Sequence, residues 1–217
     1  MAARTDRTTD PAIVADLLLA RRGTAYFLRK LKELPDDALG EPSLLPGWTR
    51  AHVVAHVGYN ARALSRLVTW AATGVETPMY PSPSARAHEI EFGATLTPNA
   101  LRNLAEHSAV HLNVEWRDLP PDRWAATVRT AQGREVPAAE TAWMRAREVW
   151  LHAVDLGNGG RFEDLPADFL GRLLADVTGT WSRRPDAVPA LARLAAWATG
   201  RSAGGVGGPG FTAPRWL

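Results

Sequence analysis

The sequence predicts a mainly α-helical protein whose core is an up-down bundle of four long helices, with one short β hairpin before the last helix. Apolar residues recur at helical spacing in four stretches of similar length. Proline, glycine and helix-capping residues separate these stretches. Four helices of similar length joined by short connections are typical of such a bundle.

The first three helices begin at capping residues. Asp10, followed by proline, starts a helix that is expected to run to about residue 34. Thr49 caps a second helix, which Gly74 ends. Thr97, also followed by proline, opens a third helix that ends before the prolines at 120 and 121.

The remaining elements follow from turn residues and periodicity. A fourth helix fits residues 139–156, and a hairpin is expected from residues 124–130 and 134–136, with Gly133 at its turn. Residues 75–92 contain prolines at 78, 81 and 83, and are expected to form an ordered loop.

The chain is expected to divide into a bundle, residues 1–160, and a small C-terminal domain, residues 161–217. Residues 166–183 and 189–199 show two further amphipathic helical patterns, and residues 202–210 are rich in glycine. A segment this short cannot hold much core alone, so we expect it to pack on the bundle.

Composition excludes several classes of function. Among 217 residues, 25 Lys and Arg against 23 Asp and Glu give a net charge of +2. No basic stripe is visible, which argues against a dedicated nucleic-acid binder. The absence of cysteine excludes disulfides, cysteine-based metal centres and a catalytic thiol of the protein itself. No apolar stretch is long enough to span a membrane, and the first ten residues lack a signal-peptide pattern, so we expect a cytoplasmic protein.

Histidine spacing indicates a candidate metal site. Glu148 and His152 lie four residues apart on the fourth helix, and one histidine from a neighbouring helix would complete two imidazoles and a carboxylate. This set leaves a zinc coordination position open, as catalytic zinc requires. Spacing alone leaves open whether His52 or His56 is the third ligand. It also leaves open the plainer reading, in which these residues form a solvated or packed helix face. The pair His107 and His111 is weaker, because no carboxylate lies at ligand spacing.

The tryptophans and arginines near these positions are first interpreted as structural residues. Trp48, Trp143 and Trp150 are expected to fill the core. Four arginines could meet an acidic substrate, although each is also an ordinary surface or structural residue: Arg86, Arg145, Arg147 and Arg201. The glycine run at residues 204–208 lacks the lysine and helix of a phosphate loop.

Five segments resemble the mycothiol-dependent maleylpyruvate isomerase family, which belongs to the DinB-like metal-binding bundle superfamily. The Gly-Trp-Thr segment marks the superfamily, whereas the Arg-Glu-x-x-x-His segment and the Thr-Pro-Met-Tyr loop are more specific. Together the segments extend over nearly the whole chain. They are residues 45–56 (LPGWTRAHVVAH), 77–80 (TPMY), 129–133 (RTAQG), 143–156 (WMRAREVWLHAVDL) and 195–201 (AAWATGR).

The resemblance implies a site as well as a fold. It implies zinc bound by His56, Glu148 and His152, and so favours His56 over His52. It also implies a small C-terminal α/β domain in which an arginine, best matched by Arg201, contributes to activity. Between residues 181 and 189 this sequence lacks an expected strand-forming stretch, so the C-terminal domain is expected to be shortened.

The resemblance further implies a reaction in which the sulfur comes from mycothiol, a low-molecular-weight thiol. Zinc would favour its thiolate, which would add to the cis double bond of maleylpyruvate. Rotation and elimination would then give fumarylpyruvate and return the thiol. Arg201 is the first candidate for orienting the substrate carboxylates, and Arg86 the second.

Three functions remain open from the sequence. The first is this isomerase, acting in gentisate-type breakdown of aromatic compounds. The second is a mycothiol S-transferase that conjugates another electrophile, in detoxification or natural-product assembly. The third is a non-catalytic bundle that has kept the fold.

Overall fold

Three of the four long helices begin where a side chain accepts hydrogen bonds from the backbone of the first turn. Asp10 caps α1 (Pro11–Glu33), Thr49 caps α2 (Arg50–Thr73) and Thr97 caps α4 (Pro98–Asp118). The fourth, α5 (Glu140–Asp155), has no side-chain cap. These bounds agree with the sequence expectation to within a residue or two, because caps and helix-ending residues fix both ends locally.

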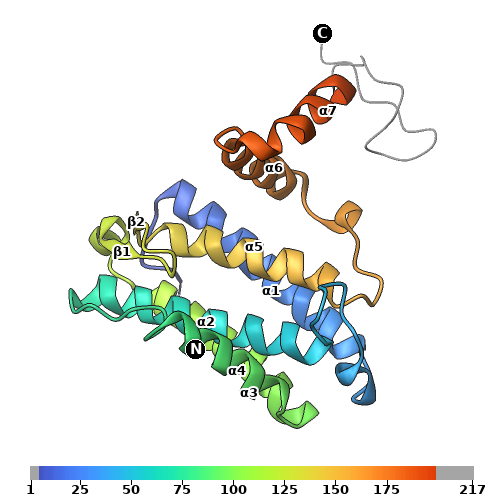
Figure 1. Ribbon diagram of the computed structural model, residues 1–217. Coiled ribbons are helices and arrows are strands. Elements are labelled where there is room, and N and C mark those ends of the chain that lie inside the picture. The colour runs from blue at the N-terminus through green and yellow to red at the C-terminus, as the bar shows by residue number, and fades with distance from the viewer. Residues whose placement is uncertain (1–4, 199–217) are drawn as a thin grey trace. The chain divides into compact units, whose positions relative to one another are not determined.

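The computed structural model describes residues 5–198. In the first of its two compact units, residues 1–164, α1 packs on α4 and α5, and α2 packs on the same two helices. The predicted four-helix bundle is thereby confirmed (Figure 1). Its core is closed by buried apolar side chains from all four helices, among them Leu17, Phe27, Val53, Leu64, Leu101, Leu112 and Val149.

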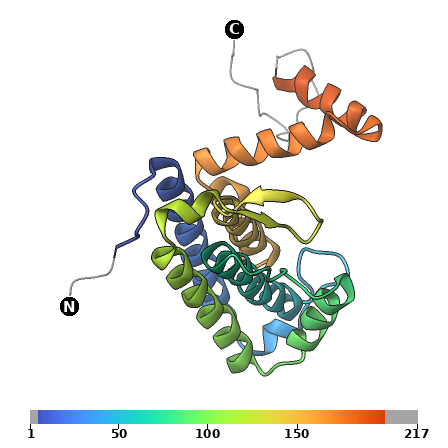
Figure 2. The same ribbon diagram turned by 90° about the vertical axis from the view of Figure 1, so that its left-hand side faces the viewer.

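The segment expected to be a loop, residues 75–92, is partly helical, and this corrects the expectation. Helix α3 (Pro83–Ala94) begins inside it, because the Ser82 hydroxyl accepts from the backbone N–H of Ala85 and Pro83 occupies the first turn. The last of the three prolines that indicated a loop, Pro83, is therefore the first residue of a helix. Helix α2 is flanked by α3 and α4 (Figure 2).

The hairpin is present but shorter than expected. Strands β1 (Thr127–Arg129) and β2 (Glu135–Pro137) pair antiparallel, and Gly133 in the turn has a φ of 79°. The expected first strand began at residue 124, but a short 3-10 helix (Pro121–Ala125) occupies that position. The proline at its start favours this helix, and its Trp124 is buried.

The second unit comprises residues 165–217 and is described as far as residue 198. It contains α6 (Ala167–Trp181) and α7 (Val188–Ala198), joined through a short 3-10 helix (Pro185–Ala187). No strand forms between residues 165 and 198. Arg201 and the glycine-rich run lie outside the described residues. Within residues 5–198, no helix is both long enough and apolar enough to cross a membrane.

Candidate metal centre

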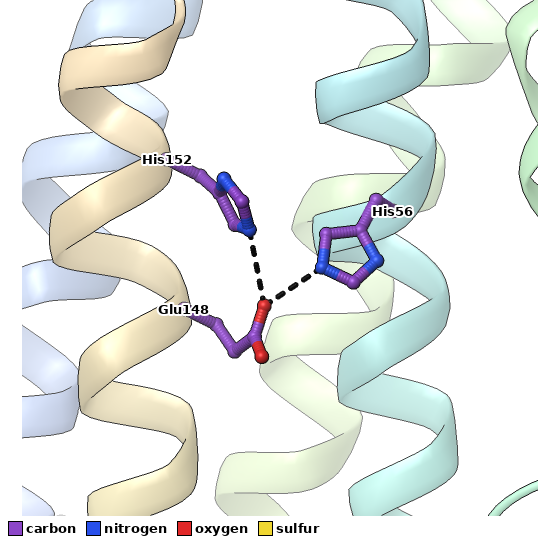
Figure 3. Close-up of side chains that lie close together, drawn as sticks. All are labelled: His56, Glu148 and His152. Carbon is purple, nitrogen blue, oxygen red and sulfur yellow. Dashed lines mark hydrogen bonds and ion pairs between the residues drawn. The ribbon is translucent and has the colours of Figure 1, made fainter. Parts of the chain in front are cut away.

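Two helices of the bundle bring three potential metal ligands together. His56 lies on α2, and Glu148 and His152 lie one turn apart on α5 (Figure 3). The Glu148 Oε2 atom is 2.8 Å from His56 Nε2 and 3.2 Å from His152 Nε2. One ligand atom from each residue lies within 4.8 Å of the other two. Within the described residues, this is the one group of three such side chains that could hold a metal ion.

A buried arginine fixes the two helices next to this cluster. Arg145, on α5, is 1% exposed, and its Nη1 donates to the carbonyl of Val57 at 2.7 Å and to Asn60 Oδ1 at 2.9 Å. Both acceptors belong to α2. Burial lowers the pKa of this guanidinium to about 10, so it stays charged at neutral pH. Because Arg145 is one turn from Glu148, this contact sets which face of α5 meets His56.

A second carboxylate orients His152. Its Nδ1 lies 2.8 Å from Asp155 Oδ2, while its Nε2 faces Glu148. Burial opposes the charge on this imidazole, but the hydrogen bonds to Asp155 and Glu148 prevail and raise the pKa of His152 to about 9. A carboxylate behind a histidine is the usual arrangement in metal sites, because it fixes the ring and its tautomer.

The charges of the other two ligands suit a divalent cation. Burial works against the charge of Glu148, but hydrogen bonds from His152 and His56 hold the pKa of this carboxyl well below its usual range. Burial lowers the pKa of His56, which therefore stays neutral at pH 7. A neutral imidazole, an ionised carboxylate and a second imidazole that can exchange its proton for a cation fit a site for zinc or a similar ion.

The structure separates His52 from this cluster. His52 Nδ1 is 2.7 Å from Thr49 Oγ1 and also accepts from the backbone N–H of Thr49, so the side chain closes a capping box at the start of α2. Its Nε2 lies 3.4 Å from Glu91. Of the two histidines that spacing left open, His52 is engaged at the start of α2, whereas His56 faces α5.

The other candidates from the sequence lie elsewhere. His107 and His111 are exposed on α4, and His111 is 4.0 Å from Glu115. Trp143 and Trp150 are buried, as expected of core residues. Trp48 differs from them, since it is only half-buried and its ring centroid lies 5.5 Å from that of His56.

Sequence reasoning missed two residues near the cluster. Asp155 follows His152 at a spacing of three, which on a helix places the two side chains together, so this signal was readable. Tyr80 belongs to the Thr-Pro-Met-Tyr loop, but nothing in its spacing indicated where its ring would lie. Burial is the main cause that raises the pKa of Tyr80, and the charge of Glu148 also contributes. Tyr80 therefore lies within electrostatic reach of the cluster.

Comparison with known proteins finds similarity in both sequence and fold. Residues 20–157 match the family described as the mycothiol maleylpyruvate isomerase N-terminal domain. A crystal structure of a mycothiol-dependent maleylpyruvate isomerase is 44% identical in sequence, with a TM-score of 0.78, and the match covers 94% of this chain and 97% of that chain. A second crystal structure, of a histidine-to-alanine mutant of such an isomerase, is 43% identical with the same TM-score and coverage. The comparison with curated proteins finds no match.

Proposed function

This chain belongs to the mycothiol maleylpyruvate isomerase family, and from that premise we propose that it converts maleylpyruvate to fumarylpyruvate in a reaction that requires mycothiol and zinc. The observation that carries the proposal is the convergence of His56, Glu148 and His152 on one small volume. A cysteine-free chain also needs an external thiol for sulfur chemistry.

Each reactant has a defined part in this proposal. Zinc, when held by the three ligands, would lower the pKa of a coordinating thiol enough to supply thiolate at neutral pH. Mycothiol would supply a nucleophile whose reversible addition turns the double bond into a single bond that can rotate. Because the thiol leaves again, it is a catalyst and is not consumed.

The protein's own residues prepare the site. Asp155 accepts a hydrogen bond from His152 Nδ1–H, which directs Nε2 toward Glu148 and makes it the nitrogen that would bind a metal once its proton is lost. The half-buried Trp48 ring packs edge-on against His56 and limits the access of water to that ligand. Arg145 supplies a buried positive charge behind Glu148 and holds α5 against α2.

The finer assignments from the sequence complete the proposal. Residues 1–160 would form the metal- and thiol-binding bundle, and residues 161–217 a small C-terminal domain whose Arg201 would contribute to activity. The place of the reaction would be gentisate-type breakdown of aromatic compounds in the cytoplasm. The two molecules that the protein binds, maleylpyruvate and mycothiol, would both be small molecules.

The test is turnover of maleylpyruvate by the zinc-loaded protein, with and without mycothiol, while free thiol is titrated. We expect conversion to fumarylpyruvate only with mycothiol, and an undiminished concentration of thiol. Loss of one thiol per product would overturn the isomerase in favour of an S-transferase. No conversion by folded, zinc-loaded protein would overturn the proposal as well.

A further inference from the structure

A cavity of about 460 Å³ opens in the first unit between the end of α2, the start of α3 and the hairpin turn. Its lining includes Trp70, Tyr80, Arg86, Arg129 and Gln132. This volume lies in the range of small-molecule sites, and the lining mixes aromatic surface with a few polar groups, as such sites do.

The loop that forms one wall of the cavity is held in place. The Arg66 guanidinium donates to the carbonyl of Met79 and forms an ion pair with Glu89 at 3.6 Å. The Thr77 hydroxyl donates to the carbonyl of Arg66 at 2.7 Å. Tyr80 therefore follows a segment that is anchored to α2 and to α3, so its position is defined before any ligand binds.

The two arginines in the lining differ in their partners. Arg129 is 3.3 Å from Glu76 and 3.5 Å from Glu135, so carboxylates of the protein already offset its charge. Between residues 5 and 198, no carboxylate lies within ion-pair distance of Arg86. Its guanidinium carbon is instead 6.0 Å from the centre of the Tyr80 ring. A half-buried guanidinium without a carboxylate partner, on the wall of a cavity, is suited to bind an anionic ligand.

Tyr80 adds a hydrogen-bond donor beside this charge. Burial is the main cause that raises the pKa of its hydroxyl, which therefore keeps its proton at neutral pH. Both residues also lie within electrostatic reach of the metal cluster. The Arg86 charge contributes to the lowered pKa of His56, after burial and His152, and the Glu148 charge acts on Tyr80.

We propose that Arg86 and Tyr80 form a carboxylate-binding site in this cavity. The guanidinium of Arg86 pairs with one carboxylate of a dicarboxylate substrate, and the hydroxyl of Tyr80 donates a hydrogen bond to the same ligand. The identity of this dicarboxylate as maleylpyruvate rests on the proposed function.

The test compares Arg86→Met, Arg86→Lys and Tyr80→Phe with a control, Arg134→Met. Arg134 is exposed on the hairpin turn and does not line the cavity, so its loss changes net charge alone. We expect Arg86→Met to raise KM for maleylpyruvate about 10- to 100-fold, with kcat changed far less and zinc content unchanged. Arg86→Lys should recover part of this loss because it keeps the charge, and Tyr80→Phe should raise KM about 3- to 10-fold.

A direct binding measurement separates this inference from the proposed function. Maleate is titrated calorimetrically into the zinc-loaded wild-type and variant proteins without thiol. Maleate binding that weakens in Arg86→Met but not in Arg134→Met supports the carboxylate site, even if the wild type fails to isomerise maleylpyruvate. If the wild type is an active isomerase and Arg86→Met, folded and zinc-loaded, keeps its KM and its maleate affinity within twofold, the carboxylate site is refuted and the function stands.

Discussion

Raising the pH of the metal-free protein from 6.5 to 9 is expected to remove most of the stabilisation that His152 gains from its two carboxylate partners. The pKa of this imidazole is about 9 in the folded protein, against 6.5 as its ordinary value. When folding raises the pKa of a group, protonation of that group stabilises the folded protein. The stabilisation is complete at a pH below the pKa of the unfolded chain, and it is lost as the pH rises through the pKa of the folded protein. The difference between the two pKa values of His152 corresponds to about 3 kcal/mol of unfolding free energy.

The assay is urea unfolding of metal-free protein at pH 6.5 and at pH 9. Other groups titrate in this interval, so the measured quantity is the difference between wild type and His152→Gln. His111→Gln is the matched control, because this histidine on α4 is exposed and its Nε2 is 4.0 Å from Glu115. We expect wild type and His111→Gln to lose about 3 kcal/mol more than His152→Gln. An equal loss in all three proteins would refute the reasoning.

Further predictions concern packing, a helix end and the metal. A Cβ added at Gly23 would lie 2.6 Å from Val149 Cγ2, so Gly23→Ala should destabilise by about 1–3 kcal/mol in urea unfolding, whereas Gly40→Ala, with open space around it, should change little; equal effects would contradict this. Gly74→Ala should cost about 1 kcal/mol, because Gly74 ends α2 at a φ of 76°, and an unchanged midpoint would argue against it. A chelator should lower the Tm of zinc-loaded protein, and an unchanged Tm would show that the metal does not stabilise the fold.

Much of the fold could be predicted because its boundaries are local. Asp10, Thr49 and Thr97 each hold a first turn through their own side chain, so the sequence shows where α1, α2 and α4 begin. The same signature at Ser82 was hidden among prolines, which indicate loops as readily as helix starts. Helix α3, and with it the position of Arg86, could therefore not be foreseen.

The candidate site was predictable only in part. The spacing of Glu148 and His152 places both on one face of α5, because residues four apart lie one turn above each other. Their distance to α2 depends on packing and on the contact from Arg145 to Val57 and Asn60, which no local pattern reveals. His52 and His56 share a helix face by the same rule, and only the resemblance favoured His56.

The central claim is that His56, Glu148 and His152 hold the metal on which thiol-dependent isomerisation depends. The most direct measurement is the zinc content of purified His56→Ala and His52→Ala proteins, taken together with mycothiol-dependent turnover of maleylpyruvate by the same samples. We predict that His52→Ala keeps one zinc ion per chain and its activity, and that His56→Ala loses both while remaining folded. Full activity of a zinc-free His56→Ala protein would contradict the account.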